Sequence, residues 1–458
     1  MNMHKDGDSV VTVYITNYNY ANYVEQAIES VLKQTYQFFE LIIIDDGSTD
    51  DSRKIISRYA GQDRVRIIFQ ENKGLNVSNN IAVHASNSDY IVRLDADDYF
   101  DENALLVMVN AISQSNDLAL VFSDYYYVDK SGEVIGQERR HDFQKDVSLL
   151  DQPAHGACTI IRRDCLLEVD AYNEEFSCQD GWDLWLKLTE TYKVANVRLP
   201  LFYYRQHGEN LTTDTDRLLE TRAAIYENHV ARMSYPQLKI VAVIPVRGRA
   251  IDSSCQMLEQ LGGKPLINWT VDAALDSHMI EELIVTTPDP ELLDHLNATY
   301  GHNITIIKRT LEESLENSYA ATIQAALQHR QASSSIDGVI ELTAESPFRS
   351  SFYINKSINI MRTHDVNVVI GVIPEDDSFY KHTGAGLEVI GNNHSSKLRL
   401  ERNYIYRQCG GINLRKYEHY IKDQDRITKK IGHIVLSKRA GIRVRNEKEM
   451  KVARSFFK

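Results

Sequence analysis

Strand and helix patterns alternate along the first half of the chain. Near-continuous apolar runs rich in β-branched residues predict buried strands at 10–15 and 39–46, and another in YIVRLDADD (90–98). Between the first two, YVEQAIESVLKQ carries apolar residues at helical spacing, which predicts an amphipathic helix. This alternation is typical of a mostly parallel sheet with helices on both faces. By contrast, two extended runs around 129–132 predict a hairpin.

The pattern restarts near residue 239, after a polar stretch that contains Pro236. The buried strand KIVAVIP opens this second half, and further strands are predicted at 282–287, 338–342 and 366–372. A chain of 458 residues is long enough for two or three domains. We therefore predict an α/β protein with two Rossmann-like, nucleotide-binding-type domains. Their predicted ranges are 1–230 and 239–458, with a linker at 231–238.

Charge and composition exclude some classes of function. The formal net charge of −13 argues against non-specific nucleic-acid binding, which needs a basic surface. None of the five cysteines forms a CxxC pair, so we expect reduced thiols rather than a disulfide or zinc framework. No apolar run reaches the roughly 18–20 residues that span a bilayer, and MNMHKDGDSV lacks the apolar core of a secretory signal. We therefore expect a cytoplasmic protein, with a peripheral position at the inner face of the membrane left open.

Two groups of carboxylates follow predicted strands. Asp45 and Asp46 end the second strand, and Asp95, Asp97 and Asp98 end a later one. Ligands of open α/β sheets bind outside the carboxyl ends of the strands. Three carboxylates this close repel one another unless a cation lies among them, and oxygen ligands suit Mg²⁺ or Mn²⁺. Such a cation would also give an acidic protein the positive charge that a diphosphate needs. The alternative is a solvated acidic turn.

A resemblance covers about half of the chain. The segment ITNYNYANYVEQAIESVLKQTYQFFELIIIDDGSTDDS, then NKG, then YIVRLDADD, resembles the large family of inverting nucleotide-sugar glycosyltransferases with the A-type fold. The resemblance implies a nucleotide-sugar donor, UDP-sugar in our prediction, and an acceptor hydroxyl on a glycan, a lipid-linked intermediate or a protein. It also implies that Thr16 and Tyr18 border the base and that Asp46 accepts a hydrogen bond from it. Asp95 and Asp97 correspond to the pair that meets ribose and metal-bound diphosphate, with Asp97 as metal ligand.

Two downstream segments supply further candidates. FSCQDGWDLWLKLTE predicts an amphipathic helix, and the resemblance makes Asp180 the base that takes the acceptor's proton, with Gln179 where the family has Glu. The alternative makes Asp180 and Asp183 helix caps, because negative charge is favoured at a helix N-terminus. LFYYRQHGENLT resembles the family's Y-R-x-H stretch. By this resemblance Arg205 pairs with a donor phosphate and His207 completes the metal or diphosphate site.

The N-terminal half departs from the family at one motif and matches it weakly at another. After N-x-G the family commonly has A-R-N, whereas this chain has Ser78, Asn79 and Asn80. The missing Arg leaves donor identity more open than the fold. AHGACTIIRRDCL, with His155 and Gly156, resembles the acceptor-side loop, and a glycine there lets a substrate approach the backbone closely.

The C-terminal half resembles cytidylyltransferases of the CMP-sialic-acid-synthetase type. The resemblance rests on IPVRGRAIDSSCQMLEQLGGKPLINWTVDAAL, on IELTAESPFRSS and on the ending HIVLSKRAGIRVRNEKEMKVA. In the family, a first loop rich in Gly and Lys cradles the triphosphate, but here only Arg247 and Gly248 remain of it. The family's D-x-D metal ligands fall on Arg443 and Arg445, and a guanidinium cannot coordinate a cation.

These departures leave several functions open. The C-terminal domain is either a pseudoenzyme that binds a partner chain, an acceptor or a nucleotide, or a domain in which Arg443 and Arg445 replace the charge of the metal and some transfer persists. Its resemblance also implies pairing into a homodimer. For the whole chain, we predict a metal-dependent glycosyltransferase. The alternatives are a bifunctional enzyme that also makes a CMP-sugar, and a non-catalytic binding component of a polysaccharide assembly complex.

Overall fold

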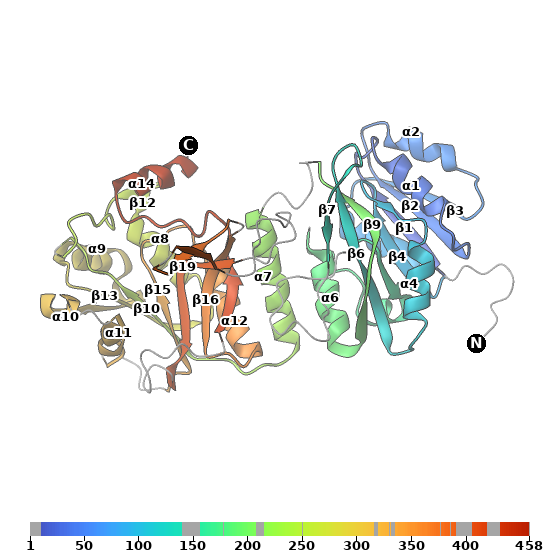
Figure 1. Cartoon of the computed structure of the whole chain (residues 1–458). Coiled ribbons are helices and arrows are strands. Elements are labelled where there is room, and N and C mark those ends of the chain that lie inside the picture. Colours follow the sequence, from blue (N-terminus) through green and yellow to red (C-terminus); the bar gives the residue numbers. More distant parts are fainter. Residues whose placement is uncertain are drawn as a thin grey trace. The chain divides into compact units, whose positions relative to one another are not determined.

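The protein forms two compact units in a computed structural model of the whole chain (Figure 1). The first unit comprises 1–214 with 378–403, and the second comprises 215–377 with 404–458. The structure describes residues 11–139, 156–176, 178–207, 215–249, 251–315, 319–328, 330, 335–375, 377–384, 386–390, 405–418 and 431–457. His155 lies outside these described residues. The linker that the sequence analysis places at 231–238 stays a prediction.

The first unit is a sheet covered by helices. Its elements in chain order are β1 (Val11–Asn17), α1 (Val24–Leu32), β2 (Phe39–Asp46), α2 (Ser52–Ile56), β3 (Val65–Gln70), α3 (Leu75–Ala85), β4 (Tyr90–Asp95), β5 (Tyr99–Phe100), α4 (Ala104–Ile112), β6 (Leu118–Val128), β7 (Val134–Glu138), β8 (Thr159–Arg162), α5 (Arg163–Glu168), α6 (Asp180–Thr191) and β9 (Lys193–Arg205). The strand order is β3-β2-β1-β4-β8-β6-β9-β5, and β7 pairs with β6.

The half of this sheet that begins at edge strand β3 is parallel and largely apolar. Strands β3, β2, β1 and β4 all run in the same direction, and β1 is buried along its whole length. Runs such as LIIID carry apolar side chains to both faces, so helices must cover both sides. In the register, Thr16 lies opposite Asp95, and Asn17 lies opposite Asp45. The parallel strands therefore bring the two predicted acidic strand ends to one edge, as the sequence predicts.

The rest of the sheet is mixed rather than parallel. Strand β8 runs antiparallel to both β4 and β6, between which it lies, and β5 runs antiparallel to β9. The predicted hairpin is confirmed as β6 and β7. The sequence analysis did not find β8, because its four residues are too few to show an alternating pattern.

The second unit has its own sheet, in the order β14-β13-β10-β15-β19-β16-β20. Its elements are α7 (Thr215–Arg232), β10 (Ile240–Pro245), β11 (Gln260–Leu261), β12 (Lys264–Pro265), α8 (Leu266–Leu275), β13 (Ile280–Thr287), α9 (Pro290–Tyr300), β14 (Thr305–Lys308), α10 (Leu311–Leu315), α11 (Tyr319–Gln328), β15 (Gly338–Leu342), α12 (Ser351–Thr363), β16 (Val368–Glu375), β19 (Ile405–Lys416), β20 (Ile431–Val435) and α14 (Glu447–Arg454). Two short strands that belong to the first unit, β17 (Tyr380–His382) and β18 (Leu387–Val389), pair with each other. Helices α7 and α12 pack side by side (Figure 1).

The strands that the sequence predicts at 282–287, 338–342 and 366–372 correspond to β13, β15 and β16. The α/β fold class of both halves is therefore confirmed. All five cysteines are free thiols, in agreement with the sequence analysis. Among the described residues, no helix combines the length and the apolar character that crossing a bilayer requires.

Candidate active site

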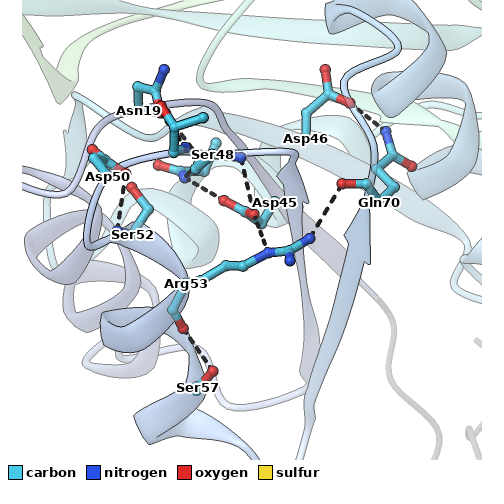
Figure 2. A network of polar contacts seen from close by, with 11 residues as sticks. Asn19, Asp45, Asp46, Ser48, Asp50, Ser52, Arg53, Ser57 and Gln70 are labelled. Carbon is cyan, nitrogen blue, oxygen red and sulfur yellow. Dashed lines mark hydrogen bonds and ion pairs between the residues drawn. The ribbon is translucent and has the colours of Figure 1, made fainter.

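The loops that follow β1 and β2 are tied to each other (Figure 2). The carboxylate of Asp45 is fully buried and accepts hydrogen bonds from Asn17 Nδ2 at 2.9 Å and from Arg53 Nε at 3.1 Å. The backbone N–H of Asn19 donates to Ser48 Oγ at 2.9 Å, which links the two loops directly. Because a buried carboxylate needs such partners, these bonds fix the shape of the strand-end edge.

Asp46 holds the loop that leads into α3. Its Oδ1 accepts from Gln70 Nε2 at 2.7 Å and from the backbone N–H of Lys73 at 2.8 Å. Its Oδ2 accepts from the backbone N–H of Gly74 at 2.9 Å. Oδ1 thus accepts two hydrogen bonds from within the chain and Oδ2 accepts one. A carboxylate oxygen can accept more than one bond, so Oδ2 can still accept another. The contact between Asp46 and a nucleobase stays a prediction.

Thr16 and Tyr18 flank this edge at the end of β1. Thr16 is 9% exposed, and its hydroxyl has no hydrogen-bond partner among the described residues. Tyr18 is 45% exposed. The turn after β2 approaches the loop before α3 closely. Gly47 has φ of +78°, and a Cβ there would lie 2.6 Å from the backbone nitrogen of Asn72. An unpaired buried hydroxyl beside an exposed aromatic ring is consistent with a ligand-facing edge, and the role of both side chains stays a prediction.

The three carboxylates after β4 lie in a largely buried cluster. Asp97 Oδ2 is 2.9 Å from His207 Nε2, so the structure brings together two residues that the sequence analysis names for one site. Burial and the charge of Asp95 raise the pKa of Asp97, although His207 opposes the shift. Burial, Asp97 and Asp95 raise the pKa of Asp98 well above its usual range. Ionising all three carboxylates is therefore unfavourable in these surroundings unless a cation lies among them.

A divalent cation fits this cluster. Asp98 Oδ2 is buried and has no hydrogen-bond partner in the part of the chain that the structure describes. Among the same residues, no three His, Cys, Asp or Glu side chains are arranged to hold a metal ion by themselves. Mg²⁺ is commonly held by one or two carboxylates together with substrate phosphates rather than by a full protein cage. Asp97 and His207, with Asp95 nearby, are the residues that could hold such an ion.

Arg205 serves as an internal connector of this region. It is only 2% exposed. Its Nε donates to the Asp97 carbonyl at 2.9 Å, and its Nη1 donates to the carbonyls of Asp129 at 3.2 Å and Lys130 at 3.0 Å. Its Nη2 donates to Gln26 Oε1 at 2.7 Å. The guanidinium thus joins the end of β4, the β6–β7 turn and α1. Its predicted contact with a donor phosphate stays a prediction, and the observed contacts give it a structural part.

The predicted base, Asp180, is paired with an arginine that the sequence analysis missed. Arg93 on β4 donates through Nη1 to Asp180 Oδ2, and through Nε to Asp95 Oδ1 at 2.7 Å. Gly156 borders the pair, since a Cβ there would lie 3.1 Å from Arg93 Nη1 and 3.6 Å from Asp180 Oδ2. The missing Cβ therefore makes room for this ion pair. The available signal was the spacing of 93 and 95, because alternate residues of a strand point to one face.

Asparagines of α3 hold the loop that precedes α6. Asn80 exchanges two hydrogen bonds with the backbone of Tyr172, at 2.9 and 3.0 Å. Asn76 Nδ2 donates to the carbonyls of Asn173 at 2.7 Å and Phe176 at 2.8 Å. Part of the segment in which the family has A-R-N thus anchors the approach to Asp180.

In the second unit, acidic side chains occupy the loop where the resembling family cradles a triphosphate. The backbone N–H of Arg249 donates to Asp289 Oδ2 at 2.6 Å, and its guanidinium pairs with Glu259 at 2.8 Å. Arg445, at a position where the family has a metal ligand, pairs with Glu449 at 2.7 Å. These two cations are therefore balanced within the chain.

Two family models match separate parts of the chain. Residues 12–169 match the family model described as Glycosyl transferase family 2, and residues 256–408 match the one described as Cytidylyltransferase. The chondroitin synthase of Escherichia coli is 30% identical over 202 residues, which cover 44% of this chain and 29% of the synthase. An uncharacterized glycosyltransferase of Nostoc is 31% identical over 217 residues, which cover 44% of this chain and 66% of that protein.

The similarity is partial in length. The chain spans less than a third of the chondroitin and hyaluronan synthases that it matches. Among solved structures, S. aureus TarS in complex with UDP-GlcNAc aligns with a TM-score of 0.41 at 17% identity, and the match covers 49% of this chain and 66% of that chain. The family matches on the two halves together show that this chain joins a glycosyltransferase family 2 domain to a cytidylyltransferase domain.

Proposed function

We propose that the first unit transfers a sugar from a UDP-sugar to a hydroxyl group of a glycan, a lipid-linked intermediate or a protein, with inversion at the anomeric carbon. One observation carries the proposal. The predicted donor-side carboxylate Asp95 and the predicted base Asp180 lie at one sheet edge and share the guanidinium of Arg93. Relatives named as synthases of chondroitin and hyaluronan favour the glycan among these acceptors.

In the proposed reaction, Asp180 takes the proton of the acceptor hydroxyl while its oxygen attacks the anomeric carbon. A new carbon–oxygen bond forms as the bond between that carbon and the diphosphate oxygen breaks, and UDP leaves. A bound Mg²⁺ or Mn²⁺ would neutralise charge on the leaving diphosphate, and Asp97 and His207, 2.9 Å apart, would hold it. Thr16 and Tyr18 would border the nucleoside at the end of β1.

The test is a transfer assay with the full chain, a panel of nucleotide sugars, glycan acceptors and Mn²⁺. We expect release of UDP that depends on the acceptor and stops with a chelator. Asp180→Asn should lower the rate by at least about a hundredfold, the usual size of a lost general base. Asp97→Asn should also lower the rate strongly, because it removes a metal ligand. Asp117→Asn is the matched control, because its side chain is 67% exposed and pairs only with Lys193 among the described residues. Full activity of the Asp180 variant would remove that residue from the mechanism.

For the second unit, we propose a pseudoenzyme that binds or dimerises rather than activating a sugar. The pairs of Arg249 with Glu259 and of Arg445 with Glu449 support this proposal, because they put a carboxylate beside the first loop and a guanidinium where the resembling family has a metal ligand. The full chain incubated with CTP, Mg²⁺ and acidic sugars should release no pyrophosphate. Pyrophosphate release that requires both CTP and sugar would instead establish the bifunctional alternative.

A further inference from the structure

We propose that Arg93 is a positioning residue that holds Asp180 in place against the donor edge of the sheet. This inference rests on the proposed glycosyltransferase activity and on the role of Asp180 as its base. It adds a residue that is not part of the acidic motifs themselves. Arg93 therefore affects the rate of sugar transfer only through the position of Asp180.

The backbone of Arg93 is fixed. Arg93 lies within β4 opposite Tyr14 of β1, and its carbonyl accepts a hydrogen bond from the N–H of Cys158 at 2.9 Å. Asp180, by contrast, is the first residue of α6 and follows Gln179, whose φ of +61° is uncommon for a residue with a side chain. Arg93, whose backbone is fixed in the sheet, therefore holds the carboxylate of Asp180, which follows an irregular turn.

The ion pair is largely shielded from water. The side chain of Arg93 is 7% exposed and that of Asp180 is 11% exposed. Charge-assisted hydrogen bonds are strong and directional in such surroundings, because water competes little for the donors. Nε of the planar guanidinium donates to Asp95, and Nη1 donates to Asp180. The rigid geometry of the guanidinium therefore sets the angle between these two hydrogen bonds. Arg93 therefore fixes where Asp180 lies relative to Asp95.

The neighbouring groups leave this pairing intact near neutral pH. The hydroxyls of Tyr14 and Tyr172 hydrogen-bond each other at 2.9 Å. Burial raises the pKa of Tyr172 to about 12 and raises the pKa of Tyr14 well above its usual value, so both hydroxyls stay neutral. Two carboxylates then share one cation, and without Arg93 they would face each other unbalanced at the same edge. Electrostatic repulsion would move Asp180 away from the reacting hydroxyl.

The space around the pair is also specific. Gly156 borders the pair, and a Cβ added there would lie 3.1 Å from Arg93 Nη1. That distance is tight enough to displace the guanidinium by a few tenths of an ångström. Gly156→Ala therefore moves the arginine without removing its charge, which gives a second and milder probe of the same contact.

The experiment is a double-mutant cycle on the full chain, with kcat for transfer and the Kd for UDP with Mn²⁺ as readouts. Arg93→Met should lower kcat by about a hundredfold, the size expected for a displaced base, and should raise the Kd for UDP by a much smaller factor, because Asp95 loses one hydrogen bond but stays on its strand. Arg93→Lys should restore part of kcat, because it keeps the charge but loses the fork. In the Asp180→Asn background, Arg93→Met should have no further effect on kcat, since residues that act as a unit are not additive.

Two results would overturn the inference. If the reductions from Arg93→Met and Asp180→Asn multiply in the double variant, Arg93 acts independently of Asp180. If Arg93→Met raises the Kd for UDP in step with the fall in kcat, it is a donor-binding residue instead. Where Arg93→Met does not fold, Gly156→Ala gives the same comparison, with a kcat loss expected only when Asp180 is present. A wild-type chain that transfers no sugar from any donor would refute the proposed function, a result separate from these two.

Discussion

Replacement of Arg205 tests whether this residue is structural. Arg205→Met keeps a long apolar stem but removes every side-chain donor. Three backbone carbonyls, those of Asp97, Asp129 and Lys130, would lose a charged donor in a buried setting. The cation–π contacts over the rings of Tyr23 and Tyr99, at 4.8 and 5.5 Å, would be lost as well.

The magnitude follows from these losses. An unsatisfied buried acceptor costs about 1–3 kcal/mol, and a partly buried cation–π contact contributes about 0.5–1 kcal/mol. Taking the low end for each of the three carbonyls and adding the two cation–π contacts, we expect a loss of about 4–5 kcal/mol in the free energy of unfolding of the first unit. For a unit of this size, each kcal/mol lowers Tm by about 2–4 °C, so Tm should fall by roughly 8–20 °C.

The assay is thermal unfolding of the full chain, followed by tryptophan fluorescence, in which Trp182 and Trp185 of α6 report on the first unit and Trp269 of α8 reports on the second. Arg58→Met is the matched control, because the Arg58 side chain is 56% exposed and pairs with an exposed glutamate. Exposed pairs contribute little, so its Tm should hardly move. If Arg205→Met leaves Tm unchanged and instead weakens donor binding, the structural reasoning is wrong and the predicted phosphate contact is favoured.

Three further predictions concern other parts of the chain. Addition of Mn²⁺ and UDP together should raise the Tm of the wild-type chain by several degrees, because ligands that bind only the folded state stabilise it. Asp97→Asn should abolish this shift in Tm, and an equal shift in the variant would exclude Asp97 as a metal ligand. Burial raises the pKa of Glu341 from 4.5 to about 7, although Arg415 and Asn413 oppose it. The folded second unit thus binds more protons than the unfolded chain over this range, so its stability should fall as pH rises from about 4.5 to about 7, and Glu341→Gln should remove this slope in thermal melts at pH 5 and pH 8; a slope unchanged in the variant would contradict the assignment. Gly47→Ala should destabilise the first unit by at least about 1–2 kcal/mol, the usual penalty for a Cβ at positive φ, and a Tm equal to that of wild type would show that the turn relaxes.

The strands that carry the acidic motifs could be predicted because their signal is local. Residues 39–46 were predicted as a strand with the bounds that β2 has, since an apolar run followed by DDGS marks both its course and its end. The convergence of Asp46 and Asp95 followed from one rule about parallel strands. The pairing of Asp97 with His207 required the family resemblance, because these residues are 110 positions apart.

Other features depend on contacts that no local pattern encodes. Arg93 and Asp180 are 87 residues apart, and an arginine within an apolar strand does not reveal its partner. The observed partners of Arg205 are mostly backbone carbonyls, which are present at every position and so leave no trace in the sequence. Strand β8 is short, and its direction follows from the neighbours it joins rather than from its own residues.

The reversed direction of β8 determines which loop reaches the reactive edge. In a purely parallel sheet, only connections that leave a strand arrive at the carboxyl edge. Because β8 runs against β4, the connection that enters it arrives there instead, and Gly156 comes to lie beside Arg93. Residues that follow β1, β2 and β4 and residues that precede β8 therefore lie at the same edge of the sheet. We therefore expect substitutions at 156–158, directly before β8, to act on the Arg93–Asp180 pair while the connections that follow β1, β2 and β4 keep their contacts.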